Sequence, residues 1–298
     1  MDILKTLLSD HNIEDIVLSP RGTLFYKEGE WQNSMEHRVP MPELWEFSRS
    51  IAENSSSTLG LTQPSVDSFW SDPFGNNFRA HVAIHPLVIR GPEVTLRRIP
   101  KIRTLKLEQF GIEPKGQSFL EKAVREGKNI LVAGSTGAGK TSLITALMDF
   151  IPPKLRVLIL EDSPELSPPT PFSTKLLTRQ NRFGFRNGAS WDLSHLVFES
   201  LRMRPDRIIL GECRGSEAYG IVTALQTGHS GIMTTLHAGN TSEALVRFRQ
   251  LAEQGGLKPN VETDSLWDVL VHIHQSPSGE RRVHEIVATQ DGSRTRII

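Results

Sequence analysis

Short apolar runs alternate with amphipathic segments in the part of the chain from Asn129 onward. The apolar runs are NILVAG, RVLILED, RIILGE and GIMTTLH, and the segments between them include TSLITALMDFI and SWDLSHLVFESLRM. Strands that are apolar on both faces are typical of a parallel sheet covered by helices on its two sides. The pattern therefore predicts an α/β domain built on a parallel sheet.

The first third of the chain has a different pattern. Short alternating segments, IEDIVLSP and GTLFYKEGEW, precede a helix-like stretch, PELWEFSRSIAEN, and two more strand-like segments follow, FRAHVAIHP and PEVTLRRIP. The stretch Met1–Asp10 carries its apolar residues on one face, which predicts a short amphipathic helix. These features predict a smaller α+β domain that precedes the α/β domain.

The segment IPKIRTLKLEQFGIEPKGQ separates the two patterns. Its Pro, Gly and charged residues are typical of an interdomain linker, which we place at about residues 99–116. The predicted domains are an N-terminal α+β domain at residues 1–113 and a C-terminal α/β domain at residues 114–298. A chain of 298 residues is long enough for two domains of roughly 100 to 200 residues each.

Charge and cysteine content narrow the classes of function. Lys and Arg together number 34, as do Asp and Glu, so net charge gives no argument for nucleic acid or an anionic membrane surface as a partner. Cys213 is the one cysteine, which excludes an intrachain disulfide and a multi-cysteine zinc module. We expect it to pack as a small buried hydrophobe rather than to act as a redox sensor.

The hydropathy pattern gives no sign of a membrane span or an export signal. No apolar run approaches the about 18 residues that a span needs, and the first residues lack a basic segment followed by an apolar core. We therefore expect a cytoplasmic protein without a transmembrane segment.

The segment GSTGAGKT lies between the apolar strand NILVA and a helix with an apolar face, which is the sequence and the context of a phosphate-binding P-loop. Its glycines let successive backbone amides face phosphate oxygens, and the helix N-terminus adds partial positive charge. Lys140 would reach the β- and γ-phosphates of ATP, and the Thr141 hydroxyl would ligate Mg²⁺. The predicted nucleotide-binding residues of the loop are Gly134, Ser135, Thr136, Gly137, Ala138, Gly139, Lys140, Thr141 and Ser142.

Acidic residues follow two of the predicted strands. LILEDSPEL places Glu161 and Asp162, and RIILGECRG places Glu212, at the carboxyl ends of strands, where ligands bind in open α/β sheets. A carboxylate at this edge can orient or deprotonate an attacking water or hold the water shell of Mg²⁺. Helix capping or a surface ion pair is the alternative role for these residues, and it is strongest for Asp162.

Four segments resemble, in order and spacing, the signature elements of the secretion-superfamily traffic ATPases, the type II/IV secretion ATPases. GSTGAGKT resembles the Walker A loop, LILEDSPEL the acidic box, RMRPDRIILGECRGSEA the Walker B strand and TGHSGIMTTLHA the histidine box. FRAHVAIHP and GPEVTLRR resemble the segment that precedes the motor domain in the type IV secretion and tight-adherence (Flp) pilus branch, so the resemblance covers roughly residues 80 to 290. It implies a RecA-like P-loop core, a hexameric ring and nucleotide bound between the two domains of each subunit.

The resemblance also implies catalytic and metal-binding residues by position. Two carboxylates, two histidines and the P-loop lysine form the implied catalytic set, and one hydroxyl and the same carboxylates are the implied Mg²⁺ ligands. The catalytic set is Glu212, Glu161, Lys140, His237 and His229, and the metal set is Thr141, Glu161 and Glu212. A role as a core histidine is the alternative for His237.

Arginines of the N-terminal domain reach the phosphates in that family, which makes Arg79, Arg97 and Arg98 candidate phosphate contacts. An arginine supplied by a mobile domain would stabilise charge on the transferred phosphoryl group only when the domains close. Arg97 and Arg98 alternate on a predicted strand, so we expect one of the two to point outward into solvent.

The chain departs from the family pattern in three places. It lacks the tetracysteine zinc module that the type II branch often carries, which disfavours that branch. Its histidine box has HAGN where much of the family has HAN, which leaves the role of Asn240 open. Its N-terminal domain lacks the long helical extension of many tight-adherence relatives, so a partner-docking mode cannot be carried over.

The function implied by the resemblance is an ATP-hydrolysing hexameric motor that powers pilus assembly or secretion, at the cytoplasmic side of the bacterial inner membrane, with platform or secretion-channel proteins as partners. A nucleotide-switched scaffold with little turnover is one alternative, against which Glu161 and Glu212 argue. A nucleic-acid-translocating motor is another, disfavoured by the neutral net charge. The one basic-aromatic patch, TRQNRFGFRNG at Thr178–Gly188, is implied to lie at the nucleotide or subunit interface.

Overall fold

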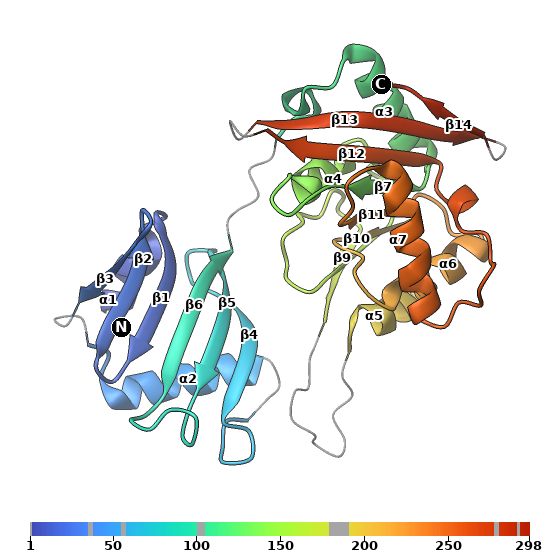
Figure 1. Ribbon diagram of the computed structural model, residues 1–298. Coiled ribbons are helices and arrows are strands. Elements are labelled where there is room, and N and C mark those ends of the chain that lie inside the picture. The colour runs from blue at the N-terminus through green and yellow to red at the C-terminus, as the bar shows by residue number, and fades with distance from the viewer. Residues whose placement is uncertain are drawn as a thin grey trace. The chain divides into compact units, whose positions relative to one another are not determined.

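The computed structural model describes residues 2–34, 38–54, 58–99, 105–178, 191–276, 280–290 and 293–298. These residues form two compact units, shown in Figure 1 with the first in blue to cyan and the second in green to red. The first unit holds the described residues up to 99, and the second holds the described residues from 105 onward.

As far as the structure describes it, the first unit is an antiparallel sheet with two helices. Among the described residues its strands run in the order β3-β2-β1-β6-β5-β4. The elements are α1 (Asp2–Ser9), β1 (Ile13–Ser19), β2 (Gly22–Lys27), β3 (Glu30–Ser34), α2 (Met41–Asn54), β4 (Ser65–Ser71), β5 (Asn77–Ala83) and β6 (Glu93–Ile99).

One face of this antiparallel sheet forms the core of the first unit. Buried and more exposed side chains alternate along β5, as they do when only one face of a strand is covered. Helix α2 packs against β4 and β5, and its Leu44 and Ile51 join Phe78 and Leu96 in the core. The predicted N-terminal helix is α1, and its Leu8 is buried in the same core.

The second unit is an α/β domain. Its first elements are η1 (Leu107–Phe110), α3 (Pro114–Glu126), β7 (Ile130–Ala133), α4 (Lys140–Met148), β8 (Val157–Glu161), β9 (Ser173–Leu177) and α5 (Leu193–Ser200). They are followed by β10 (Arg207–Leu210), α6 (Glu217–Gln226), β11 (Met233–Leu236), α7 (Thr241–Gln254), η2 (Asp264–Leu266), β12 (Val269–Gln275), β13 (Arg281–Gln290) and β14 (Ser293–Arg296).

The strands of the second unit form one mixed sheet. In the part of the chain that the structure describes, their order is β14-β13-β12-β7-β11-β10-β8-β9. The strands from β12 to β9 in this order are parallel to one another, whereas β13 pairs antiparallel with β12 and with β14. The predicted parallel sheet is confirmed, and its four predicted strands are β7, β8, β10 and β11. Strands β9, β12, β13 and β14 were not predicted from the sequence.

Two hydrophobic cores explain why the parallel strands are apolar on both faces. Ile130 and Val132 of β7 point into a core shared with α3 and α4, whereas Leu131 and Ala133 point into a core shared with α5, α6 and α7. With both faces covered, polar residues stand at the ends of the strands. The chemistry of the unit is therefore expected in the loops at the carboxyl edge of the sheet.

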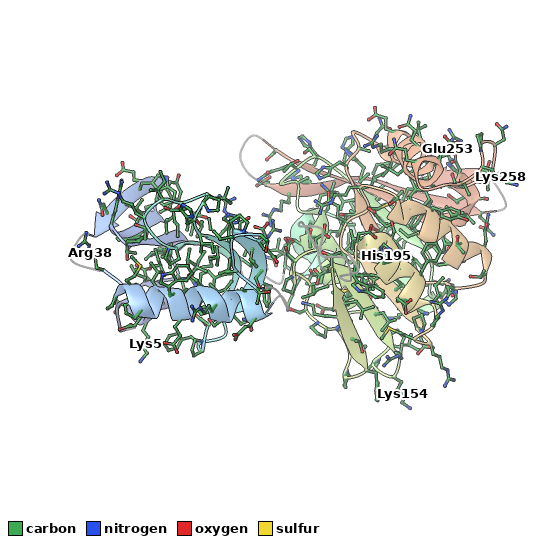
Figure 2. The ribbon with its side chains drawn as sticks, turned by 90° about the horizontal axis from the view of Figure 1, so that it is seen from below. Lys5, Arg38, Lys154, His195, Glu253 and Lys258 are labelled. Atoms are coloured by element: carbon green, nitrogen blue, oxygen red, sulfur yellow. The ribbon has the colours of Figure 1, made fainter. Side chains whose placement is uncertain are left out.

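The segment before α3 belongs to the second unit. Leu107 and Phe110 of η1 are buried in the core that contains α3 and α4, although the sequence placed both residues in the linker. Charged side chains lie outside this core: Figure 2 shows Lys154, Glu253 and Lys258 projecting away from the body of the unit. Among the helices in the described ranges, none combines the length and the hydropathy that a membrane crossing needs.

Candidate functional site

The P-loop, residues 134–139, connects the carboxyl end of β7 to α4 through a backbone that needs glycine. Gly137 and Gly139 have positive φ angles of 77° and 97°, a region that residues with a Cβ rarely adopt. A Cβ on Gly134 would lie 2.4 Å from the carbonyl oxygen of Ile273. Gly139 is the N-cap of α4 and provides no side-chain cap, so amides of the first helical turn remain available to an anion.

Lys140 folds its side chain back along the loop. Its Nζ donates to the carbonyl oxygens of Gly134 at 3.0 Å and Ser135 at 2.9 Å, and lies 3.2 Å from Nδ1 of His237. Burial lowers the pKa of Lys140, and the nearby carboxylate of Glu212 opposes that shift. The ammonium is thus desolvated and held by neutral acceptors, which phosphate oxygens can replace.

A series of polar contacts, the polar chain, runs from Lys140 through His237 to Glu212 and Arg214, which follow the Walker B strand β10. An ammonium group can only donate hydrogen bonds, so Nδ1 of His237 accepts from Lys140 and the ring proton lies on Nε2. Nε2 of His237 is 2.8 Å from Oε1 of Glu212. Arg214 Nη1 lies 3.9 Å from Oε2 of Glu212, and its Nη2 pairs with Asp162. The carboxyl ends of β8, β10 and β11 therefore meet at the P-loop, as expected for parallel strands.

Glu161 occupies a different environment from Glu212. Its side chain is 4% exposed, against 34% for that of Glu212. Oε1 of Glu161 accepts from the backbone N–H groups of Glu165 at 3.0 Å and Leu166 at 2.8 Å, and Oε2 lies 3.4 Å from Nζ of Lys175. Burial raises the pKa of Glu161. Its contacts hold the turn that follows β8, so in this structure Glu161 acts on the backbone rather than on the polar chain at the P-loop.

Asp162 is the acidic-box carboxylate that faces the polar chain. It pairs with Arg214 and accepts from the Thr178 hydroxyl at 2.9 Å, which matches the surface ion pair that was its alternative role. Apart from Thr178, the basic-aromatic segment Thr178–Gly188 lies outside the described residues, and the prediction for that segment stays a prediction.

Thr141 and Ser142, in the first turn of α4, are half-buried. The described residues contain no cluster of three or more His, Cys, Asp or Glu side chains that could hold a metal by themselves. Mg²⁺ at nucleotide sites is held by one or two protein oxygens together with phosphate oxygens and water. The hydroxyl of Thr141 and the half-buried carboxylate of Glu212 fit that donor set.

The two histidines of the predicted histidine box lie at opposite edges of the sheet. β7 and β11 are parallel, with Ile130 opposite Met233 and Ala133 opposite Leu236. His237 follows the carboxyl end of β11, beside the P-loop, whereas His229 precedes the amino end of β11 and lies 3.3 Å through Nδ1 from the Thr227 hydroxyl. Within the unit the structure does not bring His229 to the P-loop.

The three candidate arginines lie in the first unit, on β5 and β6. Arg98 donates to the carbonyl oxygens of residues 8, 10 and 13 at 2.8 to 3.1 Å and lies over the ring of Phe78, 4.8 Å from its centroid. Burial lowers its pKa. Arg97 pairs with Asp15 at 2.9 Å but keeps 71% of its side chain exposed, and it is the cross-strand neighbour of Arg79.

Other residues of the predicted site have structural roles. Asn240 caps α7, because its Oδ1 accepts from the backbone N–H of Glu243 at 2.8 Å. Ala138 and Cys213 are buried in the two cores of the unit, and burial raises the pKa of the Cys213 thiol. Cys213 therefore packs as the small hydrophobe that was predicted.

Arg214 and Arg281 were missed by the sequence reasoning. Arg214 follows the Gly-Glu of the Walker B strand, and its position one residue after Cys213 could have suggested a partner for the acidic box. Arg281 begins β13, and its Cδ lies 2.6 Å from where a Cβ on Gly139 would stand. No local pattern signals that contact, since the two residues are far apart in the chain.

The family of the chain follows from comparison with known proteins. Residues 73–273 match the family described as Type II/IV secretion system protein. The chain belongs to this family. A putative conjugal transfer protein of Mycobacterium tuberculosis is 31% identical over 293 residues, which cover 95% of this chain and 83% of that protein.

Solved structures of ATPases share the fold. The VirB11 ATPase from the Brucella suis type IV secretion system, crystallised with sulphate, is 25% identical with a TM-score of 0.50, over 96% of this chain and 92% of that one. The ATPase DotB of Legionella pneumophila has a TM-score of 0.70 at 18% identity, over 97% of this chain and 80% of that one. The predicted fold, a RecA-like P-loop domain after a smaller α+β domain, is confirmed.

Proposed function

We propose that this protein is an Mg²⁺-dependent ATPase that works as a hexameric ring and powers secretion or pilus assembly at the cytoplasmic face of the bacterial inner membrane. The observation that carries the proposal is the polar chain from Lys140 through His237 to Glu212 at the P-loop. A loop that only binds nucleotide needs the glycines and the lysine, whereas a carboxylate positioned by an imidazole suits the activation of water.

Each residue of the polar chain has a role in this proposal. Bound Mg-ATP would supply the phosphoanhydride bond that breaks and a metal that neutralises phosphate charge. Lys140 exchanges its two carbonyl partners for phosphate oxygens, and Thr141 supplies the hydroxyl ligand of the metal. His237 donates from Nε2 to one oxygen of Glu212, and the second oxygen orients the attacking water and accepts its proton.

The proposal assigns secondary roles to the remaining candidates. Arg79 on β5 and Arg97 on β6 are exposed cross-strand neighbours. We assign to them the phosphate contacts that closure of the first unit would bring. Glu161 supports the site by fixing the turn that follows β8, which contains Asp162. His229, at the other edge of the sheet, would act from a subunit boundary rather than inside its own P-loop.

The proposals of a hexameric ring and of a role in secretion are based on the proteins that this chain resembles. The matched relatives include a VirB11 ATPase of a type IV secretion system and a putative conjugal transfer protein, which supports secretion-channel or platform proteins at the inner membrane as partners. Closed cyclic symmetry would let closure in one subunit act on its neighbour. The nucleotide-switched scaffold and the nucleic-acid motor gain no support from the contacts described above.

The test is ATP hydrolysis by the full chain in Mg²⁺ and in EDTA, with Lys140→Ala beside the wild type and Lys154→Ala as a matched control. Lys154 is an exposed lysine of the same unit, as Figure 2 shows. We expect turnover to need Mg²⁺, to be lost in Lys140→Ala and to persist in Lys154→Ala. Undiminished turnover in a folded Lys140→Ala protein would overturn the proposal. Mass measurement at micromolar protein with a non-hydrolysable ATP analogue tests the ring, and a strictly monomeric, fully active enzyme would contradict it.

A further inference from the structure

The hairpin formed by β12 and β13 lies along the P-loop. The carbonyl oxygen of Ile273 in β12 packs against Gly134, and the side chain of Arg281, the first residue of β13, packs against Gly139. Nε of Arg281 lies 3.2 Å, and its Cδ 2.6 Å, from the point where a Cβ on Gly139 would stand. The stem of this arginine therefore covers the N-cap of α4, and its guanidinium lies within a few ångströms of the loop.

The guanidinium of Arg281 has no acceptor among the described residues, although its side chain is half-buried. The next residue is different: Arg282 is 69% exposed and lies 3.2 Å from the carboxylate of Glu280. A guanidinium that is partly desolvated and lacks an acceptor is costly unless an anion binds to it. The two arginines thus form a matched pair, one ion-paired and exposed, the other half-buried with its stem against the phosphate loop.

We propose that Arg281 binds the phosphates of the nucleotide from within the same chain, an inference that rests on the proposed function. The uncapped N-terminus of α4 and Lys140 set the position of the anion, and Arg281 approaches that N-terminus from β13. A guanidinium can donate two parallel hydrogen bonds to phosphate oxygens, whereas Lys140 acts as a point charge. This contact does not depend on closure of the first unit, in contrast to those proposed for Arg79 and Arg97.

A purely structural role for Arg281 predicts different behaviour. If the side chain only covers Gly139, any residue with a similar stem should leave nucleotide affinity unchanged. Gln keeps part of the stem and a polar end without charge, and Lys keeps the charge without the fork. A phosphate-binding role predicts that affinity for polyphosphate falls with both substitutions, more for Gln, while affinity for adenosine, which has no phosphate, does not change.

The experiment is equilibrium binding of ATP, ADP and adenosine to the full chain in Mg²⁺, by titration calorimetry, with thermal unfolding of the nucleotide-free proteins beside it. We expect Arg281→Gln to raise the Kd for ATP and ADP about tenfold and Arg281→Lys to raise it by a smaller factor. Arg282→Gln should stay within about twofold of the wild type. The salt dependence of ATP binding should become weaker in Arg281→Gln, because one charged contact is lost.

The outcomes separate this inference from the proposed function. Wild-type affinity in Arg281→Gln, while Lys140→Ala loses binding, overturns the inference and leaves the proposed function standing. Failure of the wild type itself to bind ATP overturns the proposed function. Equal losses in Arg281→Gln and Arg282→Gln also overturn the inference, since general electrostatics would then be the cause. If Arg281→Gln does not fold, Arg281→Lys decides the question, because wild-type affinity in that variant contradicts bidentate phosphate binding.

Discussion

The two units use their basic side chains in different ways. In the first unit Arg98 donates from Nε and Nη2 to three backbone carbonyl oxygens, which fix α1 and the segment after it against the sheet. In the second unit Lys140 also donates to carbonyl oxygens, but these belong to a glycine loop at the end of a helix, and the third partner is His237. A basic residue whose partners come from distant backbone holds the fold, whereas one that folds back on its own loop can exchange those partners for a ligand.

The largest effect should come from the carboxylate at the polar chain of the second unit. Glu212→Gln keeps the shape of the side chain and removes the charge that orients water, so we expect kcat to fall by about 100-fold or more while ATP binding is retained. Single-turnover hydrolysis with a separate binding titration measures both quantities. Glu161→Gln is the comparison, and we expect it to lose stability and a smaller share of kcat. A reversal of the two results would move the catalytic role to the acidic box.

The arginines of the first unit should separate function from stability. Arg97 is the exposed arginine, so Arg97→Ala should lower kcat at saturating ATP by roughly 10- to 100-fold with little change in unfolding. Near-wild-type kcat in Arg97→Ala would remove this residue from phosphoryl transfer.

Arg98→Ala, by contrast, removes three hydrogen bonds to buried or half-buried carbonyl groups. We expect it to destabilise the first unit by about 2 kcal/mol, measured by urea unfolding, and to leave the turnover per folded molecule close to that of the wild type. Unchanged unfolding combined with a large loss of kcat would mean that Arg98, and not Arg97, is the phosphate contact.

The smallest expected effect is the pH dependence of stability that comes from His272 in the hairpin of β12 and β13. Burial lowers the pKa of His272 from its ordinary value of 6.5, His284 and His274 add to that shift, and Glu285 and Glu243 oppose it. Folding thus favours the neutral imidazole of His272. The stability that this preference contributes is present above the ordinary pKa of histidine and is lost as the pH falls through the lowered pKa of His272 in the folded protein.

Between pH 7 and pH 5 the free energy of unfolding of the second unit should therefore fall slightly more in the wild type than in His272→Asn, and solvent screening of this half-buried ring keeps the difference small. Urea unfolding at each pH measures the difference. His11→Asn, at an exposed position of the first unit, is the control. The same pH dependence in wild type and His272→Asn would contradict the expectation.

Local sequence patterns were sufficient to predict the central strands and the P-loop of the second unit. The four central strands are apolar on both faces because two cores cover them. The P-loop is visible because its glycines and its lysine lie close together in one short segment of the chain. Strand β9 escaped prediction because its side chains are all half-buried, which leaves neither an apolar run nor an alternation. Strand β13 escaped prediction because its buried residues, Val283, Ile286 and Val287, form neither a continuous apolar run nor a regular alternation.

The candidate site was only partly predictable for a related reason. Lys140, Glu212 and His237 meet because parallel strands end at one edge, which strand positions alone indicate. The different roles of Glu161 and Asp162 depend on which carboxylate points into the turn after β8, and the approach of Arg281 to Gly139 depends on pairing between segments far apart in the chain. Neither can be obtained from spacing.

The burial of Cys213 makes it a reporter for one half of the molecule. The chain has a single thiol, that thiol is 1% exposed, and its raised pKa keeps it protonated and unreactive while the second unit is folded. A thiol reagent can modify it only through an opening of the core beneath α6 and α7. The rate of labelling thus measures the opening equilibrium of the ATPase unit alone, without an engineered probe and without a signal from the first unit, whose residues include no cysteine.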